Sequence, residues 1–274
     1  MTNVPLHERS ILHSGEAAAV RNQFKIATYV LICASVAAIG ALVAVDLTSA
    51  ALVAATLFGW SEVDGLCGTS HVGTLSPLRV LSKRMWVKSV SAYTAGGLAT
   101  AACVGMSVGA VGQLAQFGHP YISVLMYALV SVVSLGLAAR ELNLIQFPLP
   151  QIHRQTHKAW ASEFGVAKAA GMWGCHIGLA FATVVQHGGF YVVVLLAAVL
   201  GPSKGGLLFA TYWFGRTLPM WFAGTLPIDR CTAPELNRLL LENRAVYRHA
   251  AAAGLLCIPI IALLLGVEVA VTTD

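Results

Sequence analysis

Two cysteines stand beside glycines at points where long apolar segments are interrupted. Cys67 lies in the run GLCGTSHVG, four residues before His71, and Cys175 lies in the run MWGCHIG, directly before His176. Glycine allows the backbone to leave a regular helix, and irregular backbone at membrane depth is tolerated only inside protein or around a cavity. A thiol in such a break is open to attack, and a nearby imidazolium favours its reactive thiolate. The pattern predicts a redox pair, Cys67 and Cys175, with His71 and His176 in support.

A packing explanation of the same pattern stays open, because glycine and cysteine also allow helices to approach closely where they cross. The other cysteines show no such setting. Cys33, Cys103 and Cys257 fall within smooth apolar runs, where cysteine behaves as a small buried hydrophobe. Cys231 falls in a charged loop. The six cysteines have neither the spacing of a zinc module nor a CxxC motif.

The histidines raise the alternative of a metal or haem site, because imidazole and thiolate bind soft and borderline metals. His187 interrupts the apolar stretch 169–200 in the run QHGG, so it joins His71 and His176 as a candidate. The three histidines lie in three different breaks, and no HxxxH or CxxCH spacing links them. We therefore expect no resident cofactor, and we assign His187 a supporting role beside the cysteines.

Arg216 places a charge inside an otherwise apolar segment. Charges at membrane depth are costly and usually face a cavity or a partner. Glu62 or Asp64, at the broken end of an earlier apolar segment, are the candidate partners. The alternative is that the Arg216 side chain extends to the membrane interface.

The composition of the chain decides its class. Of the 274 residues, 57% are hydrophobic and 11% are charged, and the mean hydropathy is +0.73. A soluble globular protein carries about 25% charged residues, so this chain has too few to cover a water-facing surface. The formal charge of +5 does not indicate nucleic-acid binding, because the basic residues are scattered among short loops. We predict an all-α polytopic membrane protein in the lipid bilayer.

A spanning helix needs about 20 apolar residues. About seven segments approach this length, although the second is short and the fifth is long and interrupted. Their ranges are 26–45, 47–60, 89–113, 120–139, 169–200, 206–225 and 250–270. All but Lys204 and Arg216 of the 17 Lys and Arg residues fall before the first segment or in alternate loops after it. The positive-inside rule then predicts a cytoplasmic N-terminus and a periplasmic C-terminus.

The segments divide into one extra N-terminal span and two sets of three with opposite topology. Each set begins with a segment that carries one of the two cysteine breaks. Such inverted 3+3 repeats place a site near the bilayer midplane, at the interface of the repeats. The expected units are a cytoplasmic segment 1–25, the extra helix 26–46, the first repeat 47–140, a cytoplasmic connector 141–165, the second repeat 166–270 and a periplasmic tail 271–274.

These runs resemble a known family. The run MWGCHIG is similar to the Trp-Thr-Pro-Cys-Ile-Gly signature of CcdA/DsbD-type membrane thiol–disulfide transporters, and GGLLFATYWFGRTLP is similar to their next helix. In the first half, Cys67 ahead of LSPL resembles a Ser-Pro-Cys-x-x-Pro-Leu motif less closely. The prolines that the family has beside its cysteines are replaced by Leu66 and Gly174. The resemblance covers residues 50–270 and implies a redox conduit rather than a classical enzyme.

The extra N-terminal span, the histidines and the missing prolines resemble a divergent branch, the inner-membrane proteins needed to make methylamine dehydrogenase. The small subunit of that enzyme is exported, rich in disulfides, and carries a cofactor built from its own tryptophans. The resemblance implies a bacterial inner-membrane protein that supports maturation of this client. The implied partner is a periplasmic thioredoxin-like protein or a methylamine dehydrogenase subunit. Two alternatives stay open, a small-solute or metal-ion permease of the same architecture and a structural assembly factor.

Overall fold

The computed structural model describes residues 14–150, 159–179, 184–226 and 233–271. Every regular element in these ranges is a helix. Cys231 of the sequence analysis and the tail beyond residue 271 lie outside the described residues. In chain order the helices are α1 (Ser14–Leu42), α2 (Leu47–Ser61), η2 (Glu62–Asp64), α3 (Leu66–Leu75), α4 (Leu78–Leu81), α5 (Lys83–Leu114), α6 (Pro120–Glu141), α7 (Trp160–Phe164), α8 (Val166–Gly178), α9 (Gly189–Leu200), α10 (Pro202–Ala223), α11 (Ala233–Glu242) and α12 (Arg244–Val271).

Local chemistry explains where several helices begin. The Asp46 carboxylate accepts hydrogen bonds from two backbone amides in the first turn of α2, and the Ser82 hydroxyl accepts one from the amide of Met85 in α5. These caps satisfy amides that have no partner inside the helix. Gly165 and Gly201 precede α8 and α10 with φ of 78° and 83°, a backbone conformation that glycine adopts without a steric penalty. The expected span 206–225 consequently begins earlier, at Pro202.

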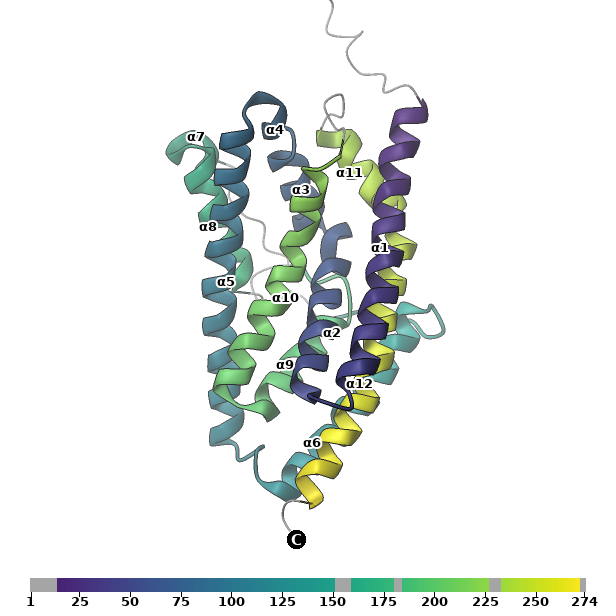
Figure 1. Ribbon diagram of the computed structural model, residues 1–274. Coiled ribbons are helices and arrows are strands. Elements are labelled where there is room, and N and C mark those ends of the chain that lie inside the picture. The colour runs from purple at the N-terminus through teal and green to yellow at the C-terminus, as the bar shows by residue number, and fades with distance from the viewer. Residues whose placement is uncertain (1–13, 151–158, 180–183, 227–232, 272–274) are drawn as a thin grey trace, which may run out of the picture.

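The helices form an elongated bundle in which α5 packs against α8 and α10, α10 packs against α2, and α12 packs against α6 (Figure 1). Close approach of α5 depends on small residues. A Cβ atom added at Gly97 would lie 1.8 Å from the ring of Trp213, and one added at Gly105 would lie 2.2 Å from the backbone oxygen of Gly205. Small residues at helix crossings are how membrane helices gain packing contacts.

Two of the expected segments are broken. In Figure 1, α2 and α3 run toward the end of the bundle where α1 begins, whereas α8 and α9 run away from it. The first break, at η2, bends the chain by 79° between residues 47–64 and 67–81. The second break separates α8 from α9 and includes Val184 to Gly188. The two breaks therefore interrupt segments of opposite direction.

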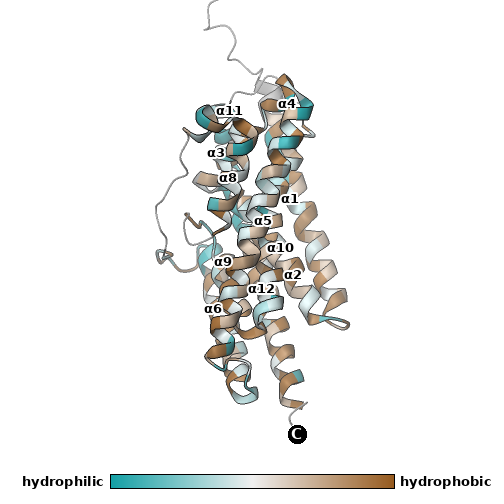
Figure 2. Ribbon diagram, turned by 90° about the vertical axis from the view of Figure 1, so that its left-hand side faces the viewer, coloured by the Kyte–Doolittle hydropathy of each residue, from teal (hydrophilic) through white to brown (hydrophobic). Residues whose placement is uncertain are grey.

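The apolar surface fits a membrane protein. Among the described residues, α1, α5, α6 and α12 are long and apolar enough to cross a membrane, and the bent pair formed by α2 with α3 makes up to five. Figure 2 shows hydrophilic residues on α4 and α11 at one end of the bundle and hydrophobic residues along α1 and α12. The count of seven spans and the inverted repeat stay predictions. α1 begins and α12 finishes at opposite ends of the bundle (Figure 1).

Candidate functional site

Four buried ionisable side chains meet where the two breaks face each other. Glu62 and Asp64 come from η2, Glu141 is the last residue of α6, and His187 precedes α9. None of the four is more than 3% exposed. Buried charges are stable only when they are paired and hydrogen-bonded, so the contacts among these groups decide the properties of the site.

His187 lies between two carboxylates. Its Nδ1 atom is 2.9 Å from Oε2 of Glu141, and its Nε2 atom is 2.9 Å from Oδ1 of Asp64. A neutral imidazole has only one N–H and can therefore donate to only one of two ionised carboxylates. Both contacts are hydrogen bonds only if the imidazole carries two protons or one carboxyl group carries the additional one. The two distances therefore fit a site that holds one proton more than a neutral imidazole between two ionised carboxylates.

The carboxylates also bind the irregular backbone ahead of α9. The two oxygens of Glu62 accept hydrogen bonds from the amides of Gln186 at 3.0 Å and His187 at 3.1 Å. The amide of Gly188 donates to Oε1 of Glu141 at 3.1 Å. These amides precede a helix and have no intrahelical acceptor, and the start of a helix favours negative charge. Glu62 and Glu141 thus hold the second break in place from η2 and α6.

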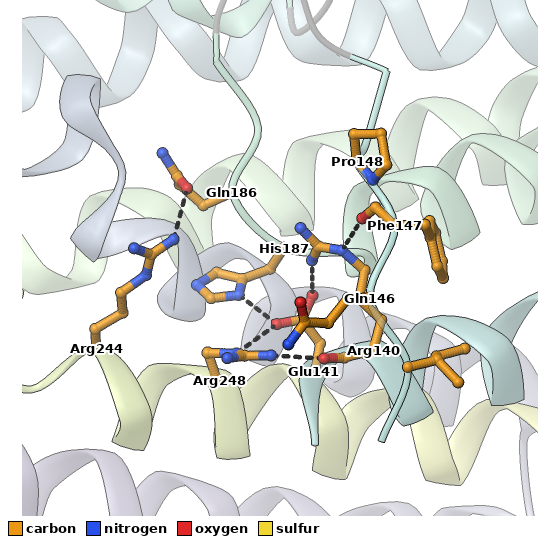
Figure 3. Close-up of a pocket in the computed structure, with 10 residues that line it drawn as sticks. Arg140, Glu141, Gln146, Phe147, Pro148, Gln186, His187, Arg244 and Arg248 are labelled. Atoms are coloured by element: carbon orange, nitrogen blue, oxygen red, sulfur yellow. Dashed lines mark hydrogen bonds and ion pairs between the residues drawn. The ribbon is translucent and has the colours of Figure 1, made fainter. Parts of the chain in front are cut away.

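Three arginines surround the outer side of this cluster (Figure 3). Arg140 donates to Oε1 of Glu141 at 2.7 Å, and Nε of Arg248 lies 3.5 Å from Oε2 of the same carboxylate. Nε of Arg244 lies 3.5 Å from Oδ2 of Asp64. The three guanidinium groups line a pocket of about 410 Å³ that reaches His187. The buried ion cluster is therefore connected to the surface on the side where α6 ends and α12 begins.

Arg216 lies deeper in the bundle, on α10. It is 8% exposed, and its guanidinium carbon lies 5.8 Å from the ring centroids of Tyr212 and Trp213, a distance typical of cation–π contacts. Glu62 and Cys67 both lie within range of its charge. Of the two carboxylates considered as partners of Arg216, Glu62 is the one that interacts with its charge. Asp64 instead pairs with His187 and Arg244.

Cys67 and His71 occupy one side of α3. The Cys67 side chain is 6% exposed, and its sulfur lies beside the backbone amide of Val184 in the second break. The Nδ1 atom of His71 donates to the carbonyl oxygen of Cys67 at 2.5 Å, so Nδ1 carries a proton. The His71 ring lies 5.2 Å from Tyr93 and 5.4 Å from Trp173, centroid to centroid. Cys67 from the first broken segment therefore faces the break of the second.

Cys175 has different neighbours. It is half-buried on α8, and its sulfur lies against Gly96 of α5, 3.0 Å from where a Cβ atom at that glycine would stand. The ring of His176 lies 6.3 Å from that of Trp160 on α7. Both thiols are free in this conformation. The histidines of the sequence analysis do not share one centre, since His71 and His176 contact aromatic rings whereas His187 contacts carboxylates. Among the described residues, no three metal-binding side chains form a group that could hold an ion.

The outer half of the site was not predicted from the sequence; it consists of Glu141, Arg140, Arg244 and Arg248. Each is a charged residue at the end of an apolar segment, where charges ordinarily meet water. One weak signal was present. Arg244 and Arg248 are four residues apart, so a helix places both on one face.

Three relatives are similar to this chain, all methylamine utilization proteins MauF. The protein of Methylorubrum extorquens is 33% identical over 193 residues, which cover 66% of each chain. Those of Paracoccus versutus and Paracoccus denitrificans are 27% and 28% identical over 65% and 66% of this chain. The matched region spans just under two thirds of each relative's length. No family model matches the chain. No solved structure matches it either.

Proposed function

We propose that this chain is a multi-pass inner-membrane protein of methylamine utilisation that supports maturation of exported methylamine dehydrogenase. The observation that carries the proposal is the 33% identity to the MauF protein of Methylorubrum extorquens over 193 residues. The apolar helices of the bundle support a membrane location. The distribution of basic residues favours a cytoplasmic N-terminus.

Thiol–disulfide exchange is the mechanism that we propose for this support. A thiolate of the Cys67–Cys175 pair attacks the disulfide of a periplasmic thioredoxin-like partner and forms a mixed disulfide. The second thiolate then displaces the partner, which leaves as a dithiol while Cys67 and Cys175 remain as a disulfide. Protons and electrons balance, because one dithiol and one disulfide exchange states. The position of the buried Cys67 sulfur beside the second break supports this role, and the free state of both thiols corresponds to the reduced form.

The exchange requires movement between the two broken segments. A disulfide needs Cα atoms within about 7 Å, and in this conformation Cys67 faces Val184 whereas Cys175 faces Gly96. A rotation of α8 against α5 would redirect Cys175. Glycines at the α5–α8 contact, among them Gly96, Gly174 and Gly178, bring the two helices close together.

A small-solute permease is the second candidate, and one observation favours it. The pocket lined by Arg140, Arg244 and Arg248 leads to buried charged groups at a helix break, as substrate sites of transporters do. The chain reconstituted in vesicles would distinguish the two candidates. A permease moves solute without any partner thiol, whereas a redox conduit moves none.

Complementation tests the proposed function. A Methylorubrum extorquens strain that lacks its mauF gene would receive either a vector that expresses this chain or the empty vector. We expect growth on methylamine and accumulation of mature methylamine dehydrogenase only with the chain. Growth on methanol is the control, because it needs no methylamine dehydrogenase. Growth without the mature enzyme, or no rescue by a chain present in the membrane, would contradict the proposal.

A further inference from the structure

The arginine pocket, defined by Arg140, Arg244 and Arg248, has no role in the exchange proposed above. Arg244 and Arg248 stand one turn apart at the start of α12, and Arg140 approaches from the end of α6 (Figure 3). The pocket encloses about 410 Å³. That volume is in the usual range for small-ligand sites, roughly 300–1,000 Å³.

The three guanidinium groups have donors to spare. Each carries five N–H groups in a fixed planar fork. The contacts of Arg140 use its Nε and Nη1 atoms, toward Phe147 and Glu141. Those of Arg244 use Nε and Nη2, toward Asp64 and Gln186. Arg248 contacts Glu141 through Nε, Asn143 through Nη1 and the backbone oxygen of Arg140 through Nη2. Each of its two Nη atoms therefore makes one contact with one of its two N–H groups. Among the described residues no acceptor engages the remaining N–H groups, which can donate to a ligand in the pocket.

The charge around the pocket is unbalanced. Among the described residues, the three arginines pair with two carboxylates, Glu141 and Asp64, and His187 adds positive charge when it carries two protons. The negative charge of Glu62 does not balance the excess positive charge of the pocket, because Glu62 interacts with the charge of Arg216. Partly buried cations with donors to spare attract an anion, and the guanidinium fork fits the oxygens of phosphate or carboxylate in pairs.

Part of the pocket lining beside Arg140 is apolar, and the guanidinium carbon of Arg140 lies 5.9 Å from the ring centroid of Phe147. Ile145 and Phe147 belong to this part and are 45% and 41% exposed, and Pro148 stands beside them. Leu144, in the same segment, is 72% exposed. A segment with such exposed apolar side chains at the end of a membrane helix is stable in contact with acyl chains. Basic pockets between membrane helices bind the head groups of anionic lipids.

We propose that the arginine pocket binds a phosphate oxyanion, and that the head group of an anionic phospholipid supplies it. The phosphate oxygens would accept from the unused N–H groups of Arg244 and Arg248, with the acyl chains along Ile145 and Phe147. Free inorganic phosphate presents the same oxygens but no acyl chains. The apolar part of the lining therefore favours the lipid as the source.

The test uses the full chain purified in detergent. Its thermal midpoint would be followed while phosphatidylglycerol, phosphatidylcholine or inorganic phosphate is added in separate titrations at fixed ionic strength. We expect stabilisation by phosphatidylglycerol and none by phosphatidylcholine, whose ammonium group cancels the phosphate charge. In the variant Arg244→Gln the apparent dissociation constant should rise about tenfold, the effect of one lost charge-assisted hydrogen bond.

Two further variants keep the test decisive. Arg238→Gln removes an arginine that is 70% exposed on α11, outside the pocket, and should titrate like the wild type. Arg244→Lys retains the charge without the fork and should give an intermediate constant, which also reports a folded pocket. Stabilisation by inorganic phosphate that equals that by the lipid supports the oxyanion site and assigns its source to a free anion. Equal titrations for all variants, or equal effects of both lipids, would overturn the proposal, whatever the outcome of complementation.

Discussion

The Nε2 atom of His187 lies 2.9 Å from Oδ1 of Asp64, and this contact ties together the breaks of two segments that are 123 residues apart in the chain. Through Nδ1 the same ring binds Glu141, so a third element joins. In the low dielectric of the interior such a network stabilises strongly when every member is satisfied and costs much when one is lost. The two breaks therefore form one unit.

Replacing His187 by leucine should strongly destabilise the protein. The change removes the side chain that contacts both Asp64 and Glu141 and leaves these two buried carboxylates without its hydrogen bonds. Loss of one partner from a buried ion pair costs about 3–5 kcal/mol. The free energy of unfolding would be measured by denaturant titration in mixed detergent micelles. Glu242→Gln is the control, because its pairs with Arg21 and Arg238 are exposed and should contribute about 0–1 kcal/mol.

The contact between His187 and Asp64 is also open to a double-mutant cycle. The variants His187→Leu, Asp64→Leu and the double variant should deviate from additivity by about 0.5–3 kcal/mol, because the residues share one network. Additive effects would mean that the two breaks are stabilised separately.

Replacing Gly174 by alanine should destabilise the contact of α8 with α5. A Cβ atom there would stand 2.1 Å from the backbone oxygen of Tyr93, which cannot move without shifting α5. Overpacking of this kind costs about 1–3 kcal/mol. Gly171→Ala is the matched control, one turn earlier on α8, where the nearest atom would be 3.7 Å away. Thermal midpoints of the two variants in detergent provide the comparison. Equal midpoints would mean that the helices separate more easily than this packing implies.

Glycine and polar residues predicted breaks near Cys67 and at His187, and the structure bends at η2, just before Cys67, and has non-helical backbone at His187. The break predicted at Cys175 is wrong, because Cys175 lies inside the regular helix α8. The sequence did not foretell the partners of His187. Asp64 and Glu141 are 123 and 46 residues away from it, and only helix packing brings them together. Glu141 also follows Arg140 at a helix end, where a charge pair is ordinarily exposed. Local pattern thus located the site, and tertiary packing determined its chemistry.

A reporter fused after Asp274 should lie in the periplasm, and one fused after Ile145 should lie in the cytoplasm. The basic residues of alternate loops predict this orientation, and the opposite placement of the start of α1 and the end of α12 supports it. Alkaline phosphatase and green fluorescent protein fusions at both positions measure it, since each is active on one side only. Phosphatase activity after Ile145, or fluorescence after Asp274, would contradict seven spans in this orientation.

Serine in place of Cys67 or Cys175 should abolish client maturation, because thiol–disulfide exchange needs sulfur at both positions. Cys103 and Cys257 are the matched controls. Cys103 is exposed on the bundle surface and Cys257 is half-buried in α12, so serine there should cost about 1 kcal/mol or less and leave maturation intact. The measurement is mature methylamine dehydrogenase in the complemented strain at matched levels of each variant. Labelling of free thiols would show in parallel whether Cys67 and Cys175 are oxidised together in the wild type. If all four variants give equal amounts of mature methylamine dehydrogenase, the cysteines serve only in helix packing. The exchange mechanism would then be wrong, and the role in methylamine utilisation would stand.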